Sequence, residues 1–186
     1  MLKTKQNYKP RILLLTFYYP PDLSAGSFRM QALVETLKQL VPKSEVSFDI
    51  YTTMPNRYFE FKCAVPEIEQ DENISIYRYQ LPKHKNGFID QAKAYQHFYK
   101  WAKRKAKKSK YDLVFATSGR LFTAFLGAQI SKSQKCPLYL DIRDIFVDTM
   151  SSILSKKLKI FLLPIFKIIE RKTIKQASHL NIVSEG

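Results

Sequence analysis

Two short, uninterrupted apolar runs restrict the fold of this chain more than any other sequence feature. Residues 11–16 read R-I-L-L-L-T, and residues 112–117 read D-L-V-F-A-T. Strands buried on both faces of a parallel sheet show this continuous pattern, whereas strands with one solvated face alternate between apolar and polar residues. The two runs therefore predict buried strands of a parallel sheet.

Strand-like and helix-like segments alternate along the rest of the chain. The strand candidates are 11–16, 46–51, 74–79, 112–117, 137–142 and 180–184. Apolar residues recur at helical spacing in the segments 30–40, 88–106, 121–130 and 153–177. Strands that alternate with helices form βαβ units. The predicted fold class is therefore α/β, with a Rossmann-like, doubly wound, mainly parallel sheet of about six or seven strands.

Three local features refine this prediction. Ser27 is the expected N-cap of the first helix. Residues 52 to about 73 are expected to form a loop between the second and third strands. Pro164 is expected to kink or break the last helix, because proline cannot donate a backbone hydrogen bond and its ring crowds the preceding turn.

The charge balance is the unusual part of the composition. Lysine and arginine total 31 against 16 aspartate and glutamate residues, which gives a formal net charge of +15. Such a surplus attracts the phosphates of nucleic acid, anionic lipid or a nucleotide, and it does not choose among them.

Neither a metal site nor a secreted protein is expected. Cys63 and Cys136 form no C-x-x-C pair, and the three histidines lie far apart, so no metal or other cofactor is predicted. Residues 1–10 lack the apolar core of a signal peptide, and no apolar stretch reaches the roughly 18 residues of a membrane span. These features favour a reduced, cytoplasmic protein.

The loop after the first strand is the first candidate for ligand binding, because open α/β sheets bind ligands beyond the carboxyl ends of their strands. It reads Y-Y-P-P-D-L-S-A-G-S-F-R, and its candidate residues are Asp22, Ser24, Ala25, Gly26 and Arg29. Gly26 allows close backbone approach at a helix N-terminus, which is a ready anion site. Arg29 is expected in the first helical turn, where a cation opposes the helix dipole. It therefore meets an incoming anion, points into solvent, or pairs with Asp22.

Two further loops carry polar residues at the same predicted edge of the sheet. Ser118, Gly119 and Arg120 follow residues 112–117, and they either bind a ligand or only cap and turn into the next helix. Asp141, Arg143 and Asp144 lie at the end of residues 137–142, where carboxylates are costly to bury without pairing. Either Arg143 pairs with Asp144, or these groups recognise sugar hydroxyls and phosphate.

In their order and spacing, these motifs resemble the N-terminal domain of retaining glycosyltransferase family 4, whose members have the GT-B fold. The resemblance rests on F-Y-Y-P-P-D-L-S-A-G-S-F-R, T-S, D-I-R-D and the final N-I-V-S-E, and it covers nearly the whole chain. It is greatest to members that build bacterial surface polysaccharides. On this resemblance, residues 1–186 form the acceptor-side N-terminal domain, and the donor-binding C-terminal domain is absent from the chain.

The resemblance implies transfer of a sugar from a nucleotide-sugar donor to a glycan or lipid-linked acceptor, without a cofactor. Gly26 and its neighbours would lie against the donor diphosphate. Many relatives carry a histidine where this chain has Arg143 and Asp144, which become the catalytic candidates without inheriting the histidine's role. We expect the fragment alone to bind donor weakly and to turn nothing over.

The basic segment 153–177 permits two interpretations. It carries seven lysine or arginine residues and one acid, Glu170, among many apolar side chains. Such a helix either lies on an anionic leaflet or packs against the core with a solvated basic side. In the first case the membrane-facing candidates are Lys156, Lys157, Lys159 and Lys167, and the protein is peripheral at the inner face of the cytoplasmic membrane.

A basic, non-catalytic module that binds nucleic acid or phosphate is the alternative function. Seven of the eleven residues from 100 to 110 are basic, and the neighbouring aromatic residues that could stack on bases are Tyr95, Phe98, Tyr99 and Trp101. Against this, Tyr95 and Tyr99 belong to the apolar stripe expected to face the sheet, which comprises Phe88, Ala92, Tyr95, Tyr99, Ala102 and Ala106. No nucleic-acid partner is therefore expected. An oxidoreductase or a hydrolase is disfavoured because G-x-G-x-x-G and G-x-S-x-G are both missing.

Overall fold

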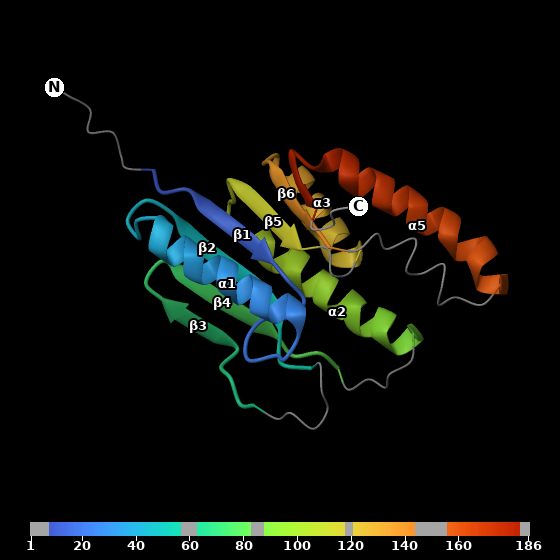
Figure 1. Cartoon of the computed structure of the whole chain (residues 1–186), viewed down its shortest axis with the longest axis horizontal. Helices are drawn as coiled ribbons and strands as arrows, with labels where there is room; N and C mark the ends of the chain where they lie inside the picture. Colours follow the sequence, from blue (N-terminus) through green and yellow to red (C-terminus); the bar gives the residue numbers. More distant parts are fainter. Residues whose placement is uncertain (1–7, 57–62, 83–87, 118–120, 144–155, 183–186) are drawn as a thin grey trace.

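The computed structural model of the chain describes residues 8–56, 63–82, 88–117, 121–143 and 156–182. These residues form seven strands and four helices around one sheet (Figure 1). The strands are β1 (Arg11–Leu15), β2 (Ser47–Thr53), β3 (Ile68–Asp71), β4 (Ile74–Tyr79), β5 (Leu113–Thr117), β6 (Leu138–Ile142) and β7 (His179–Ile182). The helices are α1 (Ala25–Leu40), α2 (Phe88–Ala106), α3 (Leu121–Gln134) and α5 (Lys156–Gln176).

The sheet has the strand order β3-β4-β2-β1-β5-β6-β7, and every neighbouring pair is parallel except β3 with β4. The α/β, Rossmann-like, mainly parallel sheet predicted from the sequence is therefore confirmed. The six predicted strands are all present, and the apolar run of residues 11–16 forms the centre of the sheet.

Successive residues of β1 point to opposite faces and so build two cores. Leu14 packs with Met30 and Val34 of α1. Leu13 and Leu15 belong to the larger core on the other face, together with residues of α2 and α3. Because side chains alternate across a strand, a run of three leucines buries both faces at once. This explains why the pattern is continuous and why helices cover both sides.

Strand β3 occupies part of the segment that was expected to be a loop, so that expectation was wrong. All four of its residues are exposed, and it forms a hairpin with β4 through a turn in which Glu72 has a φ of 50°. The buried guanidinium of Arg78 in β4 pairs with Glu69 of β3 at 2.9 Å. Cross-strand pairing rather than burial holds β3 in place, so it carries no apolar signature.

Two details of the helices differ from the sequence predictions. The N-cap of α1 is Ser24, not Ser27: Ser24 is extended, and its Oγ accepts a hydrogen bond from the Ser27 backbone N–H at 3.2 Å. Helix α5 continues through Pro164 without a break. The carbonyl that loses its partner belongs to Ile160, which is 71% exposed, so water can satisfy it.

The buried face of α2 also differs from the predicted stripe. Ala92 is exposed, whereas Phe98 is fully buried and lies at the centre of the face. None of the helices in the described residues combines the length and the apolar character that crossing a bilayer requires.

Candidate functional site

The order of the strands reverses at β1, which makes the carboxyl ends of β1 and β5 the expected position for a ligand. From β1 the chain passes through α1 on one face to β2, and from β5 it passes through α3 on the other face to β6. The two helices therefore diverge, and ligands of open α/β sheets bind in the gap between them. The first turn of α1 and the ends of β6 and β7 border this edge.

Asp141, near the end of β6, links three of these elements. Its side chain is 3% exposed, and its Oδ1 accepts from Arg29 Nη2 of α1 and from Asn181 Nδ2 of β7, each at 2.7 Å. Arg143 Nε lies 3.9 Å from the other carboxylate oxygen. Asp141 and Asn181 are register partners on adjacent parallel strands, so their side chains point to the same face.

The cluster carries one positive charge in excess, because two guanidiniums surround one carboxylate. The Arg29 side chain is 34% exposed and the Arg143 side chain 19%, while Asp141 is buried between them. A buried carboxylate needs such partners. Each guanidinium keeps its charge at every physiological pH and binds oxyanions in a planar geometry, so the cluster attracts an anion.

Gly26, the second residue of α1, lies against this cluster. A Cβ built on Gly26 would stand 3.5 Å from Arg143 Nη1 and 3.8 Å from Ser24 Oγ, which are ordinary contact distances. The protein therefore tolerates a methyl group at this position, and its φ does not require glycine. The absence of a side chain at Gly26 would let another molecule approach the backbone closely.

The N-terminus of α1 presents unpaired donors at the same place. No acidic side chain lies in its first turn. Ser27 is 0% exposed, and within the described residues its buried Oγ has no hydrogen-bond partner. The first N–H groups of a helix have no partner inside it and favour anions. The first backbone N–H groups of α1 therefore add to the positive potential of Arg29 and Arg143.

Asp22 shapes the first loop from within. It is 2% exposed, and its Oδ2 accepts from the Asn56 backbone N–H at 3.1 Å. Arg78 Nη2 donates to the carbonyl of Pro20 at 3.2 Å, ahead of the cis Pro20–Pro21 bond.

Arg29 neither points into solvent alone nor pairs with Asp22: its partner is Asp141, on a strand far away in sequence.

Several predicted site residues lie outside the described residues: Ser118, Gly119, Arg120 and Asp144. The Arg143–Asp144 ion pair considered from the sequence also lies outside the described residues, because it involves Asp144. Of the predicted residues that are described, Gly26, Arg29, Asp141 and Arg143 come together, with Ser24 as the helix cap.

Asn181 belongs to this cluster and was not singled out as a site residue from the sequence. Its position at the carboxyl end of the last predicted strand, level with Asp141, was the signal that could have found it.

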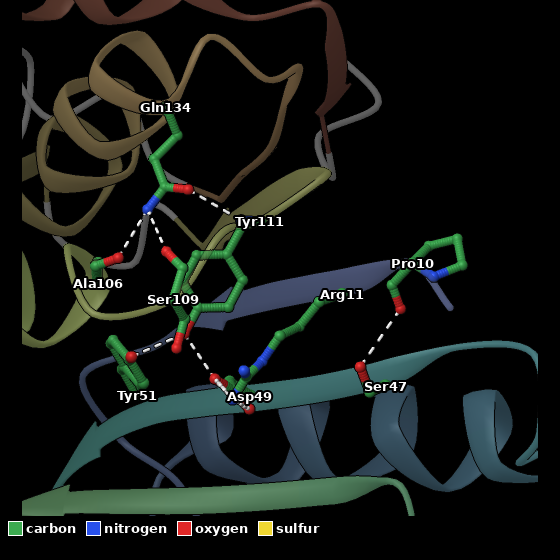
Figure 2. Close-up of polar contacts among 9 residues, drawn as sticks. All are labelled: Pro10, Arg11, Ser47, Asp49, Tyr51, Ala106, Ser109, Tyr111 and Gln134. Atoms are coloured by element: carbon green, nitrogen blue, oxygen red, sulfur yellow. Dashed lines mark hydrogen bonds and ion pairs between the residues drawn. The ribbon is translucent and has the colours of Figure 1, made fainter. Parts of the chain in front are cut away.

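A second buried polar cluster lies at the amino edge of the sheet (Figure 2). Asp49 of β2 accepts from the Tyr111 hydroxyl at 2.5 Å and forms an ion pair with Arg11 at 2.7 Å. The hydroxyls of Tyr51 and Tyr111 are 2.7 Å apart. Burial raises the pKa of both tyrosines above the ordinary value. Asp49 is paired with a cation and hydrogen-bonded, which is the arrangement of a structural group.

Gln134, the last residue of α3, completes this region. Its Nε2 donates to the carbonyls of Ala106 at 2.7 Å and Ser109 at 3.0 Å, and its Oε1 accepts from the Tyr111 N–H at 2.8 Å (Figure 2). One side chain thus fastens the α2–β5 connection to α3.

The four aromatic residues of α2 considered for base stacking do not form an exposed face: Tyr95, Phe98, Tyr99 and Trp101. Tyr95 and Phe98 are 6% and 0% exposed. Tyr99 stacks on Phe125 of α3, and Trp101 packs against the core. Among the described residues, no three histidine, cysteine or acidic side chains gather as a metal site would require.

The fold and the site define a Rossmann-like α/β protein with a cationic cluster at the carboxyl edge of its sheet. No protein-family model matches the chain, and no curated protein sequence matches it.

Proposed function

We propose that this chain is the acceptor-side N-terminal domain of a GT-B glycosyltransferase that acts in surface polysaccharide biosynthesis. The proposed reaction transfers a sugar from a nucleotide-sugar donor to a glycan or lipid-linked acceptor. One observation carries the proposal: Arg29 and Arg143, from distant parts of the chain, converge with Gly26 at the N-terminus of α1. A diphosphate fits such a site by charge and by hydrogen-bond geometry.

In this proposal the cluster stabilises the leaving group. The bond between the sugar's anomeric carbon and the diphosphate oxygen breaks, an acceptor hydroxyl oxygen bonds to that carbon, and the hydroxyl proton is released. Negative charge then develops on the diphosphate, where Arg29, Arg143 and the N–H groups of Ala25 and Gly26 would meet it. Asp141 positions the two guanidiniums, and Asp144 is the second catalytic candidate.

The donor-binding half of the enzyme lies outside these 186 residues in this proposal. The chain alone is therefore expected to bind the nucleotide weakly, with a Kd of about 1 mM, and to catalyse no transfer. Sugar transfer by the isolated chain would contradict this division of labour.

Calorimetric titration of the chain with UDP, GDP and ADP tests the proposal. We expect saturable binding of at least one nucleotide, and an affinity at least about tenfold lower for the double variant Arg29→Gln/Arg143→Gln. Lys107→Gln/Lys108→Gln, just after α2, is the control, because it removes the same charge from exposed residues away from the cluster. If none of the three nucleotides binds, or if both double variants lose affinity equally, the proposal fails.

Helix α5 favours an anionic membrane surface as a partner in the same proposal. It exposes four apolar side chains to between 50% and 73%: Ile160, Phe161, Ile165 and Ile168. Its last two turns expose Arg171, Lys172 and Lys175. Lys167 is exposed and Lys159 half-buried, while the side chains of Lys156 and Lys157 lie outside the described ones. Apolar side chains beside cations are the pattern of a helix that lies on an anionic leaflet.

Sedimentation with vesicles tests this partner. The chain should sediment with phosphatidylglycerol vesicles at low salt and not with phosphatidylcholine vesicles, and Ile160→Ser/Phe161→Ser should weaken binding. Leu40→Ser is the control, since Leu40 is 74% exposed on α1, which covers the other face of the sheet. Absence of the chain from the phosphatidylglycerol pellet removes the membrane from the proposal.

Nucleic-acid binding is measured in parallel by gel shift over a salt series. The proposal expects no retarded band at physiological salt, because the described aromatic side chains of α2 pack against the core and α3 and do not form an exposed stacking face. A complex that persists there favours the nucleic-acid-binding alternative instead.

A further inference from the structure

A second cationic feature lies between α3 and α5. A groove of about 380 Å³ is lined by Phe125, Ala128, Gln129, Lys132, Lys172, Thr173, Lys175 and Gln176. Lys132 precedes β6, and Lys172 and Lys175 precede β7. The groove therefore lies toward the amino edge of the parallel strands, whereas the Asp141 cluster lies at their carboxyl edge.

The lining of the groove is positively charged, and its described residues include no acidic side chain. Three lysines line the groove, and within the described residues none of the three forms an ion pair. Like charges around one concavity repel one another, the more so where water is partly displaced. Cations are favoured in the last turn of a helix, which explains Lys132 and Lys175. Lys172 lies too far from the end of α5 for that effect.

Neutral groups in the groove complete a set of donors. The side-chain amides of Gln129 and Gln176 are half-buried, and within the described part of the chain they make no hydrogen bond. An amide N–H₂ donates to phosphate oxygens as an ammonium group does. A fourth cation stands next to the groove: Phe125 stacks on Tyr99, and Lys103 Nζ lies 5.5 Å from the Tyr99 ring centroid.

We propose that the α3–α5 groove is a phosphate-binding site, separate from the nucleotide site proposed above. The ligand it fits is a compact phosphate-bearing molecule, either free in solution or presented as a lipid headgroup. Lys132, Lys172 and Lys175 neutralise its charge, while Gln129 and Gln176 orient its oxygens. This site does not depend on the glycosyltransferase assignment.

Sodium pyrophosphate is the probe for the first experiment, with the side-chain amide NMR signals of Gln129 and Gln176 as the local readout. We expect both signals to shift saturably. In Lys132→Gln/Lys172→Gln/Lys175→Gln the affinity should fall at least about tenfold, since each lost ammonium removes a charge-assisted hydrogen bond. The control triple variant Lys107→Gln/Lys108→Gln/Lys110→Gln carries the same net charge and should bind like the unaltered chain.

Phosphatidylglycerol vesicles form the second arm and distinguish the sources of phosphate. If vesicles broaden the two signals only while the groove lysines are present, the ligand is a lipid headgroup. If pyrophosphate alone acts, it is a soluble compound. The Arg29→Gln/Arg143→Gln variant should leave these shifts unchanged, which separates this site from the nucleotide site. The proposal is overturned if neither probe moves the signals, or if both lysine triple variants weaken binding equally.

Discussion

Asp141 shows how much of the candidate site depends on one side chain. Its carboxylate is almost fully buried and receives donors from α1 and β7. Without it, Arg29 and Arg143 would repel one another and Asn181 would lose its acceptor. The geometry of the site therefore rests on a residue that is itself out of reach of solvent.

Asp141→Asn should lower the free energy of unfolding by about 2 kcal/mol, because it removes the charge of a buried, hydrogen-bonded group. Urea unfolding followed by circular dichroism measures this loss. Asp71→Asn is the matched control, since its partner Lys38 and Asp71 itself are both exposed, and exposed pairs contribute little. Equal losses in the two variants would show that burial of Asp141 has no special weight.

Substitution of Gly26 tests whether this glycine serves the stability of the fold or the binding of a ligand. Gly26→Ala should leave the free energy of unfolding unchanged or raise it by up to about 1 kcal/mol, since alanine favours a helix and the new Cβ meets only ordinary contacts. Nucleotide affinity, measured by calorimetry on the same variant, should fall. A stable variant with unaltered affinity would remove Gly26 from the proposed site.

At the scale of elements, a glycine-to-alanine substitution in α3 should lower the free energy of unfolding, whereas in α1 it should not. A Cβ on Gly127 would lie 2.7 Å from the Cβ of Ala116 in β5 and 3.3 Å from Leu138 Cδ1 in β6. Gly127→Ala should therefore destabilise the chain by about 1–3 kcal/mol through overpacking, despite the better helix propensity. Comparison with Gly26→Ala in one urea series checks this. A stabilised Gly127→Ala variant would mean that α3 moves away from the sheet without cost.

The sequence predicted elements better than it predicted contacts. Central strands were found because burial on both faces imposes continuous apolar runs, as at Leu13–Leu15. Strand β3 was missed because cross-strand pairing, not burial, holds it. The helix start was misplaced by three residues, since Ser24 and Ser27 are equally good caps by residue type alone.

The candidate site was predicted in part, for a topological reason. Loops that follow parallel strands meet at one edge, so Gly26 and Arg143 could be expected near one another. The Arg29–Asp141 pair spans 112 residues of sequence and depends on the register of β6, which no local pattern reveals. The same is true of the contact between Asp49, inside a predicted strand, and Tyr111, just before one.

At the scale of the whole molecule, buried tyrosines couple folding to alkaline pH. Burial raises the pKa of Tyr19 from 10.0 to about 12 and also raises the pKa values of Tyr51 and Tyr111. A group whose pKa is raised by folding stabilises the native state fully below its unfolded pKa, and this stabilisation is lost as the pH rises through the folded pKa. Burial of the three hydroxyls is therefore compatible with a stable native state near neutral pH, and it lowers the free energy of unfolding at alkaline pH.

The free energy of unfolding should therefore hold from neutral pH to about pH 9 and fall steeply between pH 10 and about 12. Urea unfolding at several pH values measures the free energy, and near-ultraviolet absorbance of the phenolate reports ionisation. The phenolate signal of the buried tyrosines should rise together with unfolding rather than before it. Tyr51→Phe should flatten the fall, because it removes one buried ionisable hydroxyl. A variant with an unaltered pH profile would mean that Tyr51 ionises within the folded chain, which its burial in the core opposes.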